Sequence, residues 1–495
     1  MKKIINNTKL RYLSVFILVI TSCNDVLDTY PITDIVAPPQ DGVVLKNAIE
    51  AEAAMQSCNS IFGDEYWQFD YFFLGDAGAD VAYAGADGQE FFQIDEYRII
   101  PTNYVIARDW NHIIDFEKRC NKVINYVNDV PDLTPERRDE MIGEASLFRA
   151  LTRFQGVQTW GPIPIVDIYI SSVSNDNLPQ IYNALYPSRK SVDEVYAAII
   201  ADCEVALAKA PTSTSSPSSK YRASKGAANA LLAKVYATKP NPDWNKVIQY
   251  CDAVIAGGYS LLTNYEHLFD NAHEGNAESI WEVNGEGQGS PINSWCTNVF
   301  LGNNWKKFNT PSHTISSALD NKRKASSIKK LPTTFADPYW TTYTQFPFPW
   351  KMRATDGNQN FYIFRLADII LLKAEALAHT GDLAGSMSLV NQIRSRVLLP
   401  NVAPATSQED AINKVLKERF VELAFEGQRW FDLKREGKTI EILSQQTHPV
   451  YNPTTQTTTE VPMSYIGNLT NDDLLWPIPQ AVLDNNPNLT QNSGY

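Results

Sequence analysis

Apolar positions along this chain recur mostly at helical spacing. Within residues 361–380 the apolar positions, three or four residues apart, are Phe364, Ala367, Leu371, Ala374 and Ala378. Such spacing places these side chains on one face of a helix. Residues 383–397 repeat the pattern, and Gly381 with Asp382 between the two stretches is typical of a turn that ends one helix and begins the next. The pattern predicts an antiparallel helical hairpin similar to a tetratricopeptide unit.

Weaker versions of this pairing occur earlier in the chain. Helices are expected over 104–127 and 137–159, over 193–209 and 224–238, and over 243–256. One hairpin cannot bury its apolar face alone, so stacked copies are expected. The predicted fold class is mainly α, with tetratricopeptide-like hairpins near 104–159, 193–256 and 361–397 forming a scaffold. An irregular helical bundle without true repeats is the alternative.

Two long stretches break the helical pattern, residues 60–103 and 257–350. Both mix Gly, Asn, Asp or Pro with many aromatic residues. Loops of that length inside a compact domain are usually functional. We therefore expect residues 41–495 to form a single domain in which these two segments build a long-loop face for ligand.

The first 23 residues have the pattern of a bacterial lipoprotein signal. Four basic residues precede the apolar block 12–20, which is too short to span a bilayer, and Thr21 and Ser22 then lead to Cys23. Small residues before a cysteine at the cleavage point match a lipobox, so residues 1–22 are a predicted signal peptide, Cys23 a lipidation site and 23–40 a tether. The alternative is an ordinary secreted protein in which this cysteine occurs by chance.

Charge and cysteine content argue against several classes of protein. Residues 1–22 carry four basic and no acidic residues, so their removal shifts the formal net charge from −13 to about −17. A surface that acidic repels phosphate backbones, so no nucleic-acid partner is expected. Apart from Cys23 there are five scattered cysteines, which match neither a disulfide framework nor a zinc site. No cofactor is expected, although the short acids of the loops would permit a structural calcium ion.

Motifs of enzymes are missing from the sequence. The six histidines form no H-E-x-x-H pattern, and there is neither a G-x-S-x-G elbow nor a P-loop. Asp76 and Asp80 could form a glycosidase pair only at a separation that sequence does not fix. We therefore expect no catalysis and keep a lipid-anchored glycoside hydrolase as the least favoured alternative.

The residues of the two loop segments suit an oligosaccharide. Flat aromatic rings cover the apolar face of a sugar, and short acids and amides bind its hydroxyl groups. The predicted ligand-binding residues are Trp67, Tyr71, Asp76, Asp80, Trp281, Trp295 and Trp305. The competing interpretation of each aromatic residue is packing beneath the loops. A peptide cargo is a second interpretation of the whole chain, because grooves of helical repeats also bind peptides.

Six short blocks, in order along the chain, resemble the SusD/RagB family of nutrient-binding outer-membrane lipoproteins. They are Cys23 with Leu27, Asp28 and Pro31; Trp110-Asn111 with Asn121; F-R-A at 148–150 through W-G-P-I-P at 160–164; R-L-A-D-I at 365–369 through N-Q-I-R at 391–394; E-R at 418–419 through R-W-F-D-L-K-R at 429–435; and W-P-I-P at 476–479 through N-P-N-L at 486–489 and S-G-Y at 493–495. Ile114 and Glu117 depart from the family pattern in the first helix.

The resemblance implies how the protein would work. It implies a helical scaffold of tetratricopeptide-like units and a loop-rich face that binds nutrient oligosaccharides or polysaccharides. It also implies a partner, a SusC-like TonB-dependent transporter, over which the lipoprotein acts as a lid. Together with Cys23, it places the protein on the outer membrane, lipid-anchored and facing the cell exterior.

Overall fold

The computed structural model describes residues 44–85, 88–213, 216–301, 309–333, 339–340, 345–452, 454–455 and 457–495. Helices dominate these residues, and the strands are short and occur in pairs. The predicted mainly α fold class is confirmed. None of the helices in the described part is long and apolar enough to cross a membrane. Cys23, the segment 1–22 and the tether 23–40 lie outside the described residues, so their predicted roles stay predictions.

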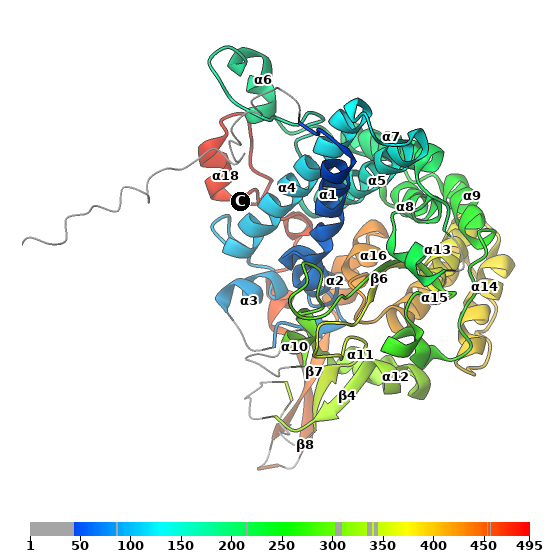
Figure 1. Cartoon of the computed structure of the whole chain (residues 1–495). Coiled ribbons are helices and arrows are strands. Elements are labelled where there is room, and N and C mark those ends of the chain that lie inside the picture. Colours follow the sequence, from blue (N-terminus) through cyan, green and yellow to red (C-terminus); the bar gives the residue numbers. More distant parts are fainter. Residues whose placement is uncertain are drawn as a thin grey trace, which may run out of the picture.

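The long helices form a scaffold in which each one packs on the next in chain order (Figure 1). They are α1 (Ala48–Asn59), α4 (Tyr104–Tyr126), α5 (Pro135–Trp160), α7 (Val192–Lys209), α8 (Lys225–Thr238), α9 (Trp244–Ile255), α13 (Leu366–His379), α14 (Leu383–Arg396) and α15 (Gln408–Glu422). Helix α9 contacts α13 although more than 100 residues separate them in the sequence. Stacking in this order buries the apolar face that no single pair can bury alone.

The turn between α13 and α14 shows how the sequence ends one helix and starts the next. Gly381 has φ +91°, a left-handed conformation that glycine adopts without strain. The Asp382 side chain accepts a hydrogen bond from Gly385 N at 2.8 Å and so caps α14. The expected helix start at residue 361 is wrong, however, because Phe361–Arg365 forms β6 and pairs with β2 (Ser279–Val283). Its aromatic and β-branched residues favour a strand.

Short strands and helices make up the rest of the described secondary structure. The paired strands, all antiparallel, are β1 (Ala82–Tyr83) with β3 (Thr310–Pro311), β2 with β6, β4 (Ile328–Leu331) with β5 (Phe346–Pro349), and β7 (Thr447–Asn452) with β8 (Thr457–Pro462). The short helices are α2 (Tyr71–Asp76), α3 (Gln89–Asp95), α6 (Leu178–Leu185), α10 (Cys296–Phe300), α11 (His313–Ala318), α12 (Asn321–Ser327), α16 (Arg429–Arg435), α17 (Thr439–Leu443) and α18 (Gln480–Asn485). Figure 1 shows β4, β7 and β8 gathered at the lower end of the view.

Residues 60–103, expected to be a ligand-facing loop, are largely helical and buried. A single π-helical turn, η2 (Tyr66–Asp70), continues directly into α2, and α3 follows. Phe69 and Phe73 stack at 5.7 Å inside the core. A helix that is buried on every side has no polar face, so the periodic pattern that identifies a surface helix is missing from its sequence.

Candidate ligand-binding site

Three of the aromatic residues predicted to contact ligand lie in the hydrophobic core. Trp67 is 1% exposed and Trp281 0%, and each ring meets the Phe62 ring edge-on at 5.4 Å. Tyr71 is also buried, and its hydroxyl accepts a hydrogen bond from Gln428 Nε2 at 2.5 Å. In this structure these three side chains make packing contacts and present no surface to a ligand, which corrects the expectation drawn from their aromatic character.

Asp76 and Asp80 are buried as well, and each holds a loop in place. Asp76 accepts hydrogen bonds from Gly427 N at 3.3 Å and from Asn309 Nδ2 at 3.0 Å, and burial raises the pKa of Asp76 to about 7. Asp80 accepts two hydrogen bonds from Arg429, at 2.7 and 3.0 Å. These contacts join segment 76–80 to the 427–429 turn and to the start of β3. Both carboxylates therefore position the loops and do not face solvent.

The close contact between these two segments explains why residue 75 is a glycine. A Cβ atom on Gly75 would lie 2.0 Å from the carbonyl oxygen of Gly427, so any side chain there would collide with backbone. The two chain segments can approach this closely only because residue 75 has no side chain.

Trp295 and Trp305 have different outcomes. Trp295 is half-buried beside α10 and packs against the core, with its ring 6.3 Å from that of Phe69. Its predicted contact with ligand stays a prediction. Trp305 lies outside the described residues.

A different set of aromatic side chains meets where separate segments converge, and we call it the aromatic cluster. Its members are Tyr83, His313, Tyr339, Trp340 and His448. Tyr339 lies between Tyr83 and His448, at centroid distances of 4.6 and 4.5 Å. Trp340 stacks on His313 at 3.9 Å with an interplanar angle of 17°. Tyr83 is buried, whereas the other four side chains are half-buried and reach the surface.

Short strands and side-chain contacts bring the aromatic cluster together. Strand β1 pairs with β3, with Ala82 opposite Pro311, and Trp340 Nε1 donates a hydrogen bond to Pro311 O at 3.1 Å. Helix α11 follows β3 in the sequence and contacts β7. Figure 1 shows α11 and β7 in the same lower part of the molecule. The Thr314 hydroxyl donates to Gln446 Oε1 at 2.5 Å, just before β7 begins. The site therefore depends on pairing between segments that are far apart in the sequence.

The aromatic cluster combines flat rings with polar ring edges. Imidazole and phenol groups both donate and accept hydrogen bonds, and an indole face covers apolar C–H surface. Burial lowers the pKa of His448, which favours its neutral ring. The loop segments named from sequence supply four of the five residues, but His448 in β7 was missed. No spacing in the sequence links residue 448 to residue 83, so only the folded chain reveals their proximity.

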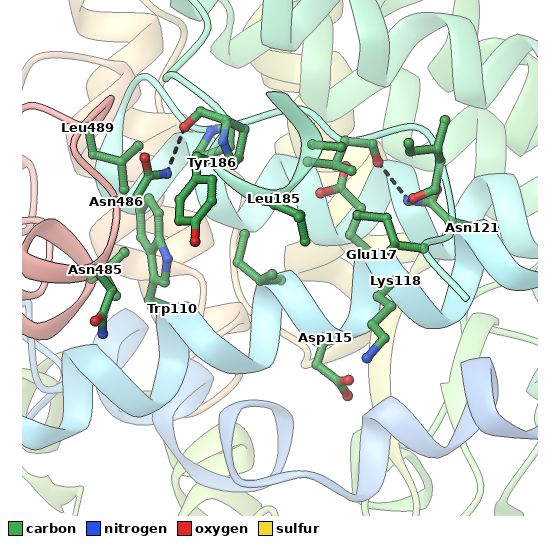
Figure 2. A pocket seen from close by; sticks show the side chains of 18 residues that line it. Trp110, Asp115, Glu117, Lys118, Asn121, Leu185, Tyr186, Asn485, Asn486 and Leu489 are labelled. Carbon is green, nitrogen blue, oxygen red and sulfur yellow. Dashed lines mark hydrogen bonds between the residues drawn. The ribbon is translucent and has the colours of Figure 1, made fainter. Parts of the chain in front are cut away.

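A separate groove of about 240 Å³ lies along α4 (Figure 2). Its walls come from α4, from the segment 164–187 that contains α6, and from α18 with the residues that follow it. Asn121 Nδ2 donates to Val166 O at 2.6 Å and Asn486 Nδ2 donates to Pro187 O at 2.9 Å, the two hydrogen bonds drawn in Figure 2. These bonds hold the walls of the groove to one another.

Two of the side chains that line the groove are covered or already paired. Trp110 is 4% exposed and so presents almost no surface to a ligand. Glu117, one of the two departures from the family pattern, faces inward and pairs with Arg153 at 2.5 Å. Its carboxylate is therefore already neutralised by a guanidinium group.

Two family models match successive parts of the chain. The model described as the SusD family matches residues 278–495, and the model described as "Starch-binding associating with outer membrane" matches residues 78–237. SusD-like protein P2 of Formosa agariphila is 24% identical over 97% of this chain and 98% of its own length. A SusD-like protein of Bacteroides ovatus is 24% identical over 76% of this chain and 79% of its own length.

Solved structures share the fold at low sequence identity. A SusD-like protein from Bacteroides fragilis has a TM-score of 0.75 at 21% identity, covering 92% of this chain and 99% of that one. A laminarin-binding SusD-like protein has a TM-score of 0.73 at 24% identity, covering 91% and 100%. Surface glycan-binding protein A from Bacteroides thetaiotaomicron, in complex with laminarihexaose, has a TM-score of 0.72 at 18% identity, covering 90% and 100%. With the two family models matching most of the described chain, the protein belongs to the SusD/RagB family.

Proposed function

We propose that this protein binds oligosaccharides or polysaccharides at the aromatic cluster and has no catalytic activity. The observation that carries the proposal is the convergence of half-buried aromatic side chains from three segments around the buried Tyr83, with Trp340 stacked on His313. Two proteins of the same fold support it, since one is described as laminarin-binding and the other is in complex with laminarihexaose. The family model for residues 78–237 is described as starch-binding.

The chemistry of the aromatic cluster matches a sugar chain. A pyranose ring has an apolar C–H face that packs on Trp or Tyr and a rim of hydroxyl groups that bind polar ring edges. The carboxylates considered for a glycosidase pair, Asp76 and Asp80, are engaged by Asn309, Gly427 and Arg429. Their role as loop anchors favours binding over hydrolysis.

Replacing Trp340 tests the position of the site. We expect Trp340→Ala to weaken binding of laminarihexaose or starch oligosaccharides roughly tenfold, because the largest ring of the aromatic cluster is lost. Isothermal titration of the soluble mature chain measures the dissociation constant. The matched control is Trp244→Ala, since Trp244 is also half-buried and stacked on a histidine, His379 at 3.9 Å, but lies on α9 of the scaffold.

Equal glycan affinity of the wild type and the folded Trp340→Ala variant would show that the aromatic cluster is not the binding site. Release of shorter sugars during incubation would contradict the non-catalytic role. Peptides recovered with the native protein in place of glycans would favour the peptide-cargo alternative.

We further propose that a lipid at Cys23 holds the protein to the outer membrane, where it delivers glycans to a SusC-like TonB-dependent transporter. The lipobox pattern before Cys23 supports the anchor, and the family model described as associating with the outer membrane supports the location. The long acidic tether would let the domain move over a barrel without leaving the membrane.

Replacing Cys23 separates the anchor from the binding face. We expect Cys23→Ala to move the protein from the membrane fraction to the soluble fraction, because no acyl chain can be attached. Membrane fractionation and fatty-acid labelling measure the change, and glycan affinity should match the wild type. Retention of the variant in washed membranes, with labelling intact, would show that Cys23 is not the anchor.

A further inference from the structure

A histidine–aspartate–histidine cluster lies on two consecutive short turns outside the aromatic cluster. His267 is in the 3₁₀ turn η5 (Tyr265–Leu268), His273 is in η6 (Asn271–His273), and Asp270 caps η6. The two imidazole rings are nearly parallel, 3.6 Å apart with an interplanar angle of 8°. His273 Nδ1 lies 2.6 Å from Asp270 Oδ1, and one ligand-type atom from each residue lies within 4.8 Å of the others. The three residues therefore already face one another.

The backbone that carries these residues is fixed by its neighbours. Leu268 O accepts a hydrogen bond from the Tyr362 hydroxyl at 2.7 Å, and Phe269 O accepts one from Gln359 Nε2 at 3.2 Å. The side chains of Leu268 and Phe269 are buried in a small hydrophobic core of their own. A turn held by two hydrogen bonds and two buried side chains presents its polar side chains on a fixed backbone, which is what a binding site requires.

The electrostatic surroundings favour a cation. Within the described part of the chain, no Lys or Arg forms an ion pair with Asp270. The Asp270 and His273 side chains are 26% and 42% exposed, so an ion can enter from solvent. Two imidazoles in face-to-face contact would repel each other if both were protonated, whereas a shared metal ion would use both as neutral ligands.

We infer that His267, Asp270 and His273 form a binding site for a divalent transition-metal ion of the zinc type. Imidazole nitrogen and carboxylate oxygen are preferred ligands of Zn²⁺, while Ca²⁺ and Mg²⁺ favour all-oxygen sets. The ion replaces the proton between His273 Nδ1 and Asp270 Oδ1, and the His267 ring turns toward it. Three protein ligands leave the fourth tetrahedral position to water. The site is independent of the proposed glycan binding.

A second group of potential ligands shows what a less suitable site looks like. Glu375, His379 and Glu436 also lie close together, but Arg435 binds the Glu375 carboxylate with two nitrogens and lies 3.3 Å from Glu436. The Trp244 ring covers His379 at 3.9 Å. A guanidinium cation already occupies the position that a metal would need, so this group serves as the internal control.

Zinc titration of the mature chain, prepared without a polyhistidine tag, tests the inference. We expect one equivalent of Zn²⁺ to bind by isothermal titration, and His267→Ala and His273→Ala each to weaken that binding at least tenfold. His379→Ala should leave it unchanged. Excess Ca²⁺ should not compete. Circular dichroism verifies that each variant is folded.

Cu²⁺ loaded into the same protein supplies a second measurement. Electron paramagnetic resonance should show hyperfine coupling to two imidazole nitrogens in the wild type and to one in His273→Ala. The inference is overturned if the wild type takes up no Zn²⁺, if both histidine variants bind it as the wild type does, or if His379→Ala abolishes the binding.

Discussion

We expect Trp281→Ala to lower the free energy of unfolding by about 3–5 kcal/mol, which is the usual cost of removing a buried large aromatic side chain. Trp281 lies in β2 and is 0% exposed. Its ring meets Phe62 at 5.4 Å, Phe148 of α5 at 5.2 Å and Phe364 of β6 at 6.3 Å, so its loss leaves a cavity between the β2–β6 pair and helix α5. Because neighbours from separate elements surround the site, they cannot collapse to fill it.

Urea denaturation of the mature chain measures this loss through the shift of the midpoint at constant m-value. The matched variant Trp281→Phe keeps an aromatic ring, so its free energy of unfolding should fall clearly less than that of Trp281→Ala. Glycan affinity of both folded variants should equal that of the wild type, since the ring presents no surface to ligand. A Trp281→Ala variant with unchanged stability and lost glycan affinity would contradict this expectation and would show that Trp281 contacts the ligand.

We expect Arg365→Met to lower the free energy of unfolding by about 3–5 kcal/mol, because it leaves buried carboxylates without their partner. Arg365 ends β6, is 1% exposed, and contacts Glu426 at 2.7 Å, Glu422 at 2.8 Å and Glu278 at 3.0 Å. Its Nη2 also donates to Glu422 O at 2.9 Å. This one side chain joins the end of β6 to the end of α15.

The cost of Arg365→Met should depend on pH. Burial alone would raise the pKa of Glu422, but the guanidinium groups of Arg396, Arg323 and Arg365 hold it well below its usual range. The stability contributed by ionised Glu422 is therefore present above its unfolded-state pKa of about 4.3 and is lost as the pH falls toward the folded-state value. Without Arg365, burying the ionised carboxylates costs free energy that its guanidinium group no longer offsets. The free energies of unfolding of wild type and variant should therefore differ more at pH 7.5 than at pH 4.5.

Urea denaturation at both pH values measures this difference. Arg98→Met is the matched control, because its pair with Glu96 at 2.6 Å is exposed and worth about 1 kcal/mol or less. Equal losses of unfolding free energy for Arg365→Met and Arg98→Met would show that the buried ion cluster does not stabilise the junction between β6 and α15.

The candidate site was predictable only in outline. The sequence pointed to the segments 60–103 and 257–350, and four members of the aromatic cluster lie in them. The particular residues were misassigned, because Trp67 and Trp281 have the same composition-based signal as a ligand-facing tryptophan. Whether an aromatic ring packs inward or faces solvent depends on its neighbours from distant segments, such as Phe62 beside Trp281.

By itself the sequence determined the helical scaffold, since that structure depends on local signals. Apolar spacing of three and four residues, the left-handed Gly381 and the capping Asp382 act within one or two turns of chain. Only the tertiary structure decided that residues 60–103 are buried, that Asp80 binds Arg429, and that His448 joins Tyr339. It also decided that His267 and His273 meet across Asp270. Those contacts depend on long-range packing and on irregular turns, for which no repeating pattern of apolar residues exists.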